Sequence, residues 1–314
     1  MKYTDKTVRD ACEAWLKTAR RNGLEAATLK AYRSHAHIHI EPRMGDRFLT
    51  DLSRSDIRDF MDELLDDGVS RALTRKVMVS LRSILSEAVE REWMAANVGL
   101  EVKMKRSKRG TEERIIPTKD EIRRILDNAP ESHRALLVTA IFTGMRVSEL
   151  RGLTWKHVDL DRGVIFVRQR ADEQGKIGAP KSRAGVRDIP MAPMVKNTLA
   201  SWKQEAPDSA LDLVFPNSVG KVQSYSNFYN RVFKPMLVEN GIVDAEGEPK
   251  FAVHSLRHAA ASLFIEQGWN PKKIQTLLGY ATIGMTMDTY GHLFDSSEED
   301  LTMFAKLESD LLAA

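Results

Sequence analysis

The sequence predicts a mainly α-helical protein with two domains, the second of which contains a small antiparallel β-sheet. The chain has 314 residues, and a compact domain usually holds about 100–200. Apolar residues recur at helical spacing through the N-terminal third, whereas residues 163–169 and 185–191 alternate as strands do. We therefore expect an α+β chain with two hydrophobic cores.

The composition is typical of a soluble globular protein. Hydrophobic residues make up 42% and charged residues 29% of the chain, and no run of about 18 apolar residues is available to span a bilayer. The N-terminus has no apolar stretch of the kind found in secretory signals. A single cysteine, Cys12, rules out an intramolecular disulfide and a cysteine-based zinc site. We expect no membrane contact and a reducing, cytoplasmic location.

The first expected domain, residues 1–102, consists of four amphipathic helices. Ser53 is an expected N-cap, and Asp56 stands three residues later, where it completes a capping box. Gly23 and Gly68 are expected to end two of the helices. The four helices are expected at residues 7–23, 24–40, 53–68 and 70–93.

Basic residues in this part of the chain are candidates for DNA contact. The net charge of +3 is too small to indicate nucleic-acid binding by itself, so the distribution of charge matters more. A solvated helix face and a solvated linker explain the same residues equally well. The candidates are Arg71, Arg75, Lys76 and Arg82 on the fourth helix, and Lys103, Lys105, Arg106, Lys108 and Arg109 in a basic linker, residues 103–116.

The second expected domain, residues 117–295, is mostly helical. Thr118 and Glu121 form a capping-box pattern where it begins, and Asn270 precedes Pro271 as an expected cap. A glycine-rich, basic hairpin region separates the two expected strands. Helices are expected at residues 118–130, 133–144, 193–206, 224–240, 254–267 and 271–278, followed by an amphipathic helical tail at 296–314.

The segment HSLRH contains the first group of residues that could carry chemistry. His254 and Arg257 share one face near the start of a helix, where the helix dipole favours a phosphate. His258 lies four residues after His254, so zinc binding must be weighed. The acid that a metalloprotease helix needs is replaced by Ser255, and no third ligand is apparent, so we expect no metal site.

Three further segments are weak signals singly but informative in their order. They are TGMRVSEL with Arg146 and Glu149, PKSRAGVRDIP with Lys181, and TMDTYGHLF with Tyr290. Together with HSLRH, these segments make residues 7–295 resemble the tyrosine recombinases of the phage-integrase type. The resemblance implies a helical core-binding domain, a linker and an integrase-type catalytic domain.

The resemblance also assigns roles to individual residues. It implies that Tyr290 is the nucleophile, that Arg146 and Arg257 bind the phosphate, and that Glu149 supports the first arginine. His254 would then act as base or proton shuttle for the phenol, whose pKa is ordinarily about 10. Lys181 would protonate the departing 5′ oxygen. A phenol suits this chemistry because its ester with phosphate stores the bond energy, so neither a metal nor another cofactor is required.

One position departs from the family pattern. Tyr280 stands in LLGY where the family commonly has a histidine that donates a hydrogen bond to the scissile phosphate. A tyrosine hydroxyl can also donate such a bond. Tyr280 is in addition a second candidate nucleophile, although the alignment of the motif favours Tyr290.

The expected activity is therefore site-specific strand exchange in double-stranded DNA through a 3′-phosphotyrosyl intermediate, integrating or excising a mobile element of bacterial or phage origin. A DNA-relaxing enzyme of the type IB topoisomerase kind and a catalytically silent DNA-binding relative are the alternatives. Expected partners are attachment or crossover sites, further copies in a dimer or tetramer on DNA, and possible accessory DNA-bending or directionality factors. The tail fits docking on its own domain or on a neighbouring protomer. The chain lacks the extra N-terminal arm-binding domain of many phage integrases, so we expect a simpler recombinase or a truncated one.

Overall fold

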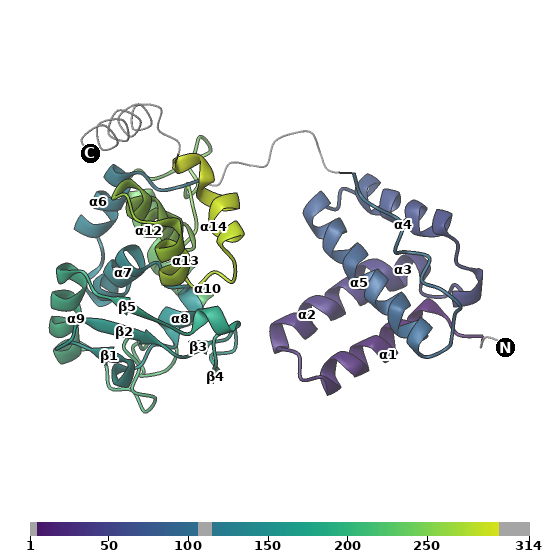
Figure 1. Ribbon diagram of the computed structural model, residues 1–314, viewed down its shortest axis with the longest axis horizontal. Helices are drawn as coiled ribbons and strands as arrows, with labels where there is room; N and C mark the ends of the chain where they lie inside the picture. Colours follow the sequence, from purple (N-terminus) through teal and green to yellow (C-terminus); the bar gives the residue numbers. More distant parts are fainter. Residues whose placement is uncertain (1–4, 106–114, 295–314) are drawn as a thin grey trace, which may run out of the picture. The chain divides into compact units, whose positions relative to one another are not determined.

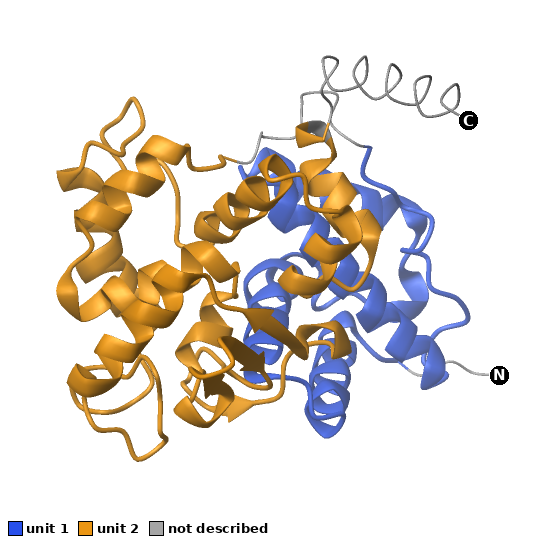
Figure 2. Cartoon of the chain, turned by 60° about the vertical axis from the view of Figure 1, so that its left-hand side comes forward, with its two compact units in different colours: residues 1–111 blue, residues 112–314 orange. Residues whose placement is uncertain are grey.

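The computed structural model describes residues 5–105 and 115–294 and divides the chain into two compact units, residues 1–111 and 112–314 (Figure 2). The boundary falls within the segment 103–116 that the sequence predicts as a linker. Arg106, Lys108, Arg109 and the tail at 296–314 lie outside the described residues. None of the helices in the described part of the chain is long and apolar enough to cross a membrane.

The N-terminal unit is helical throughout (Figure 1). Its core is a single cluster of buried apolar side chains, against which the partly buried Tyr32 of α2 packs, and α1 and α5 pack closely. The predicted capping box of Ser53 and Asp56 forms at the start of α4. The elements are α1 (Val8–Arg21), α2 (Ala26–Ser34), the π-helix η1 (His35–Ile40), α3 (Glu41–Met44), the 3₁₀-helix η2 (Leu49–Asp51), α4 (Arg54–Asp66) and α5 (Arg71–Glu90).

The helix predicted at residues 24–40 is longer than expected and changes its winding. It runs as α2, η1 and α3 without a break, and Pro42 lies in the first turn of α3. A proline inside a regular α-helix removes a hydrogen bond and clashes with the preceding turn. A wider π turn directly before it relieves that conflict, and the same arrangement recurs before Pro235 in the C-terminal unit.

The C-terminal unit packs helices around a small sheet (Figure 1). The predicted capping box of Thr118 and Glu121 forms at α6, and the Asn270 side chain caps α13. The helix α14 was not predicted from the sequence. The α-helices are α6 (Lys119–Asp127), α7 (Glu131–Thr143), α8 (Val147–Arg151), α9 (Pro193–Glu205), α10 (Tyr225–Phe228), α11 (Lys234–Glu239), α12 (Ser255–Glu266), α13 (Pro271–Leu278) and α14 (Ile283–Tyr290), with the short helices η3 (Trp155–His157), η4 (Arg183–Gly185), η5 (Tyr229–Phe233, π) and η6 (Gly291–Leu293).

The strands are β1 (Val158–Asp159), β2 (Val164–Val167), β3 (Arg170–Ala171), β4 (Ile177–Gly178) and β5 (Arg187–Pro190). They form one antiparallel sheet of order β1-β2-β5 and a separate antiparallel pair, β3-β4. Ile165 lies opposite Ile189, and Val167 lies opposite Arg187. All four side chains are buried on one face, because alternate residues of a strand point the same way. The sheet therefore directs Arg187 into the interior.

Gly144 ends α7 in the left-handed conformation, with φ of 60°. A Cβ atom at this position would lie 2.5 Å from Leu278 Cδ2 and 3.1 Å from Ala260 Cβ. The glycine thus lets α12 and α13 approach the end of α7, and Arg146 follows two residues later.

We predict that Gly144→Ala destabilises the C-terminal unit more than Gly163→Ala. Both glycines have positive φ, of 60° and 67°, but no atom lies within 4 Å of a Cβ built on Gly163. Gly163→Ala should cost about 1–2 kcal/mol of backbone strain. Gly144→Ala should add about 1–3 kcal/mol of overpacking. The free energy of unfolding measures both, and equal losses would contradict this account of Gly144.

Candidate active site

The C-terminal end of α13 gathers three arginines from different parts of the chain. Leu277, Leu278 and Gly279 follow one another, and each backbone carbonyl accepts a hydrogen bond from a different guanidinium group. The donors are Arg187 Nε to Leu277 at 2.5 Å, Arg257 Nη2 to Leu278 at 2.5 Å, and Arg146 Nη2 to Gly279 at 2.9 Å. The last carbonyls of a helix lack helical partners and carry partial negative charge, so they suit cationic donors.

The carboxylate of Glu149 joins two of these arginines. Its Oε1 lies 2.8 Å from Arg146 Nη1, and its Oε2 lies 2.8 Å from Arg187 Nη2. The side chains of Glu149 and Arg187 are both buried. Burial by itself would raise the pKa of Glu149, but hydrogen bonds and charge from Arg187, with charge from Arg146, lower the pKa below its ordinary value. Glu149 is therefore ionised and fixes the two guanidinium groups.

Arg257 is the most enclosed of the three cations, with 2% of its surface exposed. Its Nη1 donates to the Gly144 carbonyl at 2.6 Å, and its guanidinium carbon lies 4.6 Å from the ring centre of Tyr280. Burial lowers the pKa of Arg257, but an arginine remains charged in a protein at neutral pH. Arg146 differs because 31% of its side chain is exposed and can meet a ligand.

Tyr290 ends α14 with none of its surface exposed, in a small apolar cluster formed with α12 and α13. Its hydroxyl lies 2.7 Å from His258 Nδ1 and 3.3 Å from the hydroxyl of Tyr280. The ring of His254 stands edge-on to that of His258, with 5.2 Å between the ring centres. The two tyrosines and two histidines therefore form one group beside Arg257.

The candidate residues named from the sequence come together with one exception. Arg146, Glu149, His254, Arg257, Tyr280 and Tyr290 belong to the connected group described above. Lys181 lies exposed in the loop after β4 and makes no hydrogen bond or ion pair with another residue of the described ranges. His254 is also exposed, just before the first residue of α12.

Two residues of the group were missed as participants from the sequence. Arg187 lies two positions before Ile189 on a predicted strand, so both side chains point to the buried face. A buried cation needs an acidic partner. The alternation of this strand therefore could have identified Arg187 as a buried residue of the site. His258 was considered only as a zinc ligand, and its proximity to Tyr290 depends on how α14 packs against α12, which local sequence does not reveal.

The described residues contain no group of three or more His, Cys, Asp or Glu side chains that could hold a metal ion. Cys12 is buried in the N-terminal unit, where burial raises the pKa of its thiol to about 12.

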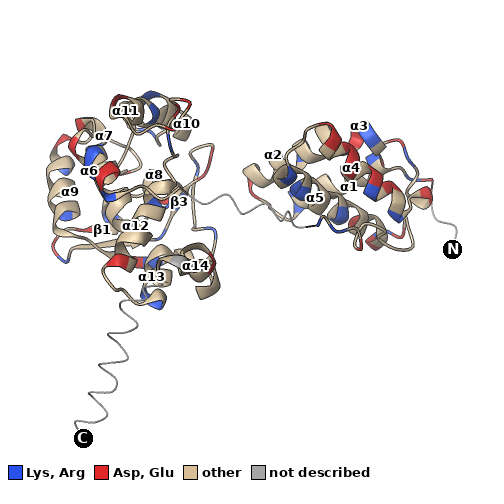
Figure 3. Ribbon diagram, turned by 90° about the horizontal axis from the view of Figure 1, so that it is seen from above, with Lys and Arg blue, Asp and Glu red and all other residues tan. Residues whose placement is uncertain are grey.

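The basic residues of the N-terminal unit that are candidates for DNA contact differ in their exposure and in their hydrogen bonds. Lys and Arg occur along α5 (Figure 3). Arg75 and Lys76 are exposed, and Arg71 is exposed while donating to the Lys105 carbonyl at 2.7 Å. Arg82 is half-buried and donates to the carbonyls of Gly99 and Val102, at 3.0 and 2.5 Å. Its guanidinium therefore holds the loop after α5. Lys103 and Lys105 lie in the described part of the linker.

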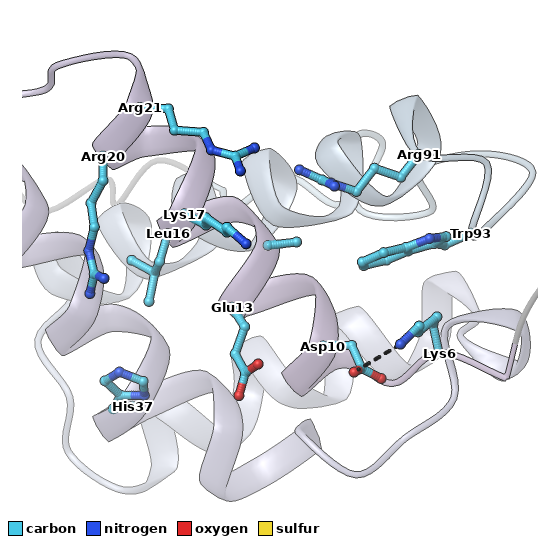
Figure 4. A pocket seen from close by; sticks show the side chains of 11 residues that line it. Lys6, Asp10, Glu13, Leu16, Lys17, Arg20, Arg21, His37, Arg91 and Trp93 are labelled. Carbon is cyan, nitrogen blue, oxygen red and sulfur yellow. Dashed lines mark hydrogen bonds and ion pairs between the residues drawn. The ribbon is translucent and has the colours of Figure 1, made fainter.

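A second basic surface of this unit lies along α1 (Figure 4). It is a groove with a volume of about 760 Å³. Asp10 pairs with Lys6, whereas Lys17, Arg20 and Arg21 form no ion pair among the described residues. Trp93 lies in the groove with Lys6 and Arg91 within 5.5 Å of its ring. The groove thus carries both charges and an aromatic surface.

Family models match both units. Residues 116–297 match the model described as Phage integrase family, and residues 7–65 match the model described as Phage integrase, N-terminal SAM-like domain. The first match alone covers more than half of the chain, and it includes the whole group of residues around Arg257 and Tyr290.

Two curated relatives and one solved structure give the range of similarity. The transposase of transposon Tn916 from Enterococcus faecalis is 29% identical over 176 residues, which is 52% of this chain but only 43% of the transposase. The chain therefore spans less than half of that relative. The tyrosine recombinase XerD of Listeria monocytogenes is 26% identical over 286 residues, 86% of this chain and 89% of XerD. The integrase of transposon Tn1549 in complex with a circular intermediate DNA has a TM-score of 0.81 at 21% identity, covering 96% of this chain and 99% of that one.

We predict that Glu149→Gln destabilises the C-terminal unit by about 3–5 kcal/mol, because it leaves two guanidinium groups without their buried anion. Since the pKa of Glu149 is lowered in the folded state, its contribution is complete above the unfolded value of about 4.3 and is lost as pH falls through the folded value. The difference from wild type should therefore shrink in acid. Hydrogen exchange of the α8 and β5 amides measures this stability.

Asp188→Asn is the matched control for Glu149→Gln. Asp188 pairs with Arg168 at 2.5 Å on the surface, where 54% and 37% of the two side chains are exposed. Such a pair contributes about 1 kcal/mol at most. A loss for Glu149→Gln no larger than that for Asp188→Asn would contradict the role of the buried carboxylate.

Proposed function

The chain belongs to the phage integrase family, and from this premise we propose that it is a site-specific tyrosine recombinase that cuts and rejoins DNA through a 3′-phosphotyrosyl bond. The observation that carries the proposal is the position of the Tyr290 hydroxyl. It lies in hydrogen-bonding range of His258 and Tyr280, and Tyr280 packs against Arg257. A phenol held beside fixed guanidinium groups suits attack on a phosphodiester.

Arg146 and Arg257 are the proposed phosphate-binding residues. Arginine presents several donors in a plane that matches two phosphate oxygens, and its charge does not depend on pH in the working range. Their anchoring to Gly279, Leu278 and Gly144 supports this role because donors that are already oriented need little rearrangement as charge develops on phosphorus.

Lys181 and His254 are the proposed groups for proton transfer and hydrogen bonding at the phosphate. Both side chains are exposed, so a DNA phosphate can reach them. A lysine on a loop can reach the 5′ oxygen and protonate it when the P–O bond breaks. Tyr280 is proposed to donate a hydrogen bond in place of the family histidine, and its location between Arg257 and Tyr290 supports this.

The proposed partners follow from the reaction. Exchange between two duplexes requires four strands to be cut, each by one tyrosine, so we expect a tetramer on DNA. Attachment or crossover sites are the proposed substrate. The helical N-terminal unit is proposed as the core-binding domain, residues 103–116 as its linker, and the tail at 296–314 as a contact between protomers. Accessory factors that bend DNA or set direction are further proposed partners. We propose that the protein acts on the DNA of a mobile element in the cytoplasm of a bacterial cell.

We predict that wild type forms a covalent adduct on a nicked duplex taken from an end of the element that carries the gene. Tyr290→Phe should form none, because it lacks the nucleophilic oxygen. Tyr280→Phe should still form the adduct. Denaturing gel electrophoresis detects the adduct, and mass spectrometry identifies the modified tyrosine. A wild-type protein that binds this duplex without an adduct would support the catalytically silent alternative.

The same duplex tests the arginine role and the topoisomerase alternative. Arg146→Ala should slow adduct formation by about 10²–10³-fold, whereas Arg162→Ala, at an exposed turn with the same change of charge, should leave the rate unaltered. Relaxation of supercoiled plasmids without any element sequence, at the rate seen with that sequence, would favour the topoisomerase alternative.

A final prediction concerns DNA binding by the N-terminal unit, which we propose uses Arg71, Arg75 and Lys76 on α5. Replacing Arg75 and Lys76 together with alanine should weaken binding and reduce the slope of log affinity against log salt by about 2, since each phosphate contact contributes about 1. Replacing Arg20 and Arg21 with alanine is the control, because it removes the same two positive charges from the α1 groove instead of from α5. A larger change of slope for the control pair would assign DNA binding to the groove instead.

A further inference from the structure

The hydroxyl of Tyr290 contacts a histidine to which the proposed function assigns no step of the reaction. Tyr290 is fully buried, yet its most polar atom lies 2.7 Å from Nδ1 of His258, a distance typical of a good hydrogen bond. His258 is itself 8% exposed and lies on α12 directly after Arg257. A buried imidazole therefore contacts the oxygen of the proposed nucleophile directly.

The tautomer of His258 decides what this contact can do. A phenol donates to Nδ1 only when the ring is neutral and its proton is on Nε2. In that form Nδ1 carries a lone pair that can accept the phenolic hydrogen. A second contact of the hydroxyl within the described residues, to Tyr280 at 3.3 Å, is longer and joins two groups that are both weak acids. His258 is therefore the better proton acceptor of these two neighbours.

His254 occupies a different position relative to solvent. It is exposed at the start of α12, where a phosphate oxygen can meet both its ring and the positive end of the helix. Its ring stands edge-on to that of His258, with 5.2 Å between centres. The two histidines can thus contact different atoms in one reaction. His254 can bind a phosphate oxygen, and His258 can bind the phenol of Tyr290.

We propose that His258 orients the phenol of Tyr290 and accepts its proton as the phenolic oxygen attacks phosphorus. This inference depends on the proposed recombinase function. In the step, a bond forms between the Tyr290 oxygen and phosphorus, and the bond from phosphorus to the 5′ oxygen breaks. The phenolic proton passes to His258 Nδ1, and the 5′ oxygen takes its proton from Lys181. Religation returns both protons, so no oxidant, reductant or metal is consumed.

His258→Asn is the informative substitution. The asparagine side-chain oxygen reaches about the position of Nδ1 and can accept the hydrogen bond, but an amide does not take up a proton at neutral pH. A loss caused only by misplacement of Tyr290 should therefore be rescued by asparagine and not by alanine. A loss caused by missing proton transfer should persist in both variants, at about 10²-fold or more.

The test compares two nicked duplexes from the element end, one ordinary and one with sulfur in place of the bridging 5′ oxygen. A thiolate leaves without being protonated, so the sulfur substrate removes the need for an acid but not for a base. We expect His258→Asn to slow adduct formation about 10²-fold on both substrates. A wild-type rate for His258→Asn, or a loss confined to the ordinary substrate, would overturn the proposal.

His133→Asn is the matched control, because His133 on α7 is also a histidine with a side-chain partner, Gln223 at 2.8 Å, and is partly buried. It should keep the wild-type rate, and all variants should bind the intact duplex as wild type does. Absence of any adduct with wild type would contradict the recombinase function itself. An adduct with wild type and an equal rate with His258→Asn would contradict the role of His258 alone.

A measurement on the unmodified side chain keeps the proposal testable if His258→Asn does not fold. NMR of the histidine ring nitrogens in the full chain reports which nitrogen carries the proton, and the signal of His258 is identified by its shift in Tyr290→Phe. We expect a neutral ring with its proton on Nε2. A ring protonated on Nδ1 at neutral pH could not accept from the phenol and would overturn the proposal.

Discussion

The C-terminal end of α13 is the constraint on which the candidate site depends. Three consecutive carbonyls there, of Leu277, Leu278 and Gly279, each accept from a different arginine, and the carboxylate of Glu149 joins Arg146 to Arg187. Guanidinium groups repel one another unless anions separate them, so the helix end and the carboxylate together make it possible to assemble three cations in a largely buried place. The residue that follows, Tyr280, is thereby fixed beside Arg257.

The same arrangement separates structural cations from those able to meet a ligand. Arg187 is buried with its donors directed to Glu149, Gly185 and Leu277. Arg146 shares Glu149 but keeps nearly a third of its side chain exposed, at 31%. If Arg146 were buried as fully as Arg187, the two arginines could contribute to folding stability but could not contact a ligand. Because one of the two guanidinium groups reaches solvent, the buried carboxylate orients the group for which we propose phosphate binding.

The covered position of Tyr290 has consequences for its chemistry. A phenol surrounded by Ile265, Ile274 and Leu278 is shielded from water, and its hydroxyl is satisfied by His258. In the same helix the hydroxyl of Thr286 is buried without a hydrogen-bond partner among the described residues. An unpartnered buried hydroxyl costs about 1–3 kcal/mol. The buried hydroxyl of Thr286 therefore offsets part of the free energy that the packing of α14 contributes to folding.

The sequence by itself determined the local structure and the family. Capping boxes at Ser53 and Thr118, the cap at Asn270, the strands around Ile165 and Ile189, and the predicted α+β class are confirmed, because each depends on neighbours within a few residues. The π turns before Pro42 and Pro235 and the helix α14 were not predicted. Only the tertiary structure decided that Arg187 binds Glu149, that Arg82 serves its own loop and that His258 meets Tyr290. Those contacts join residues 17 to 38 positions apart, and their geometry is set by how whole helices and strands pack.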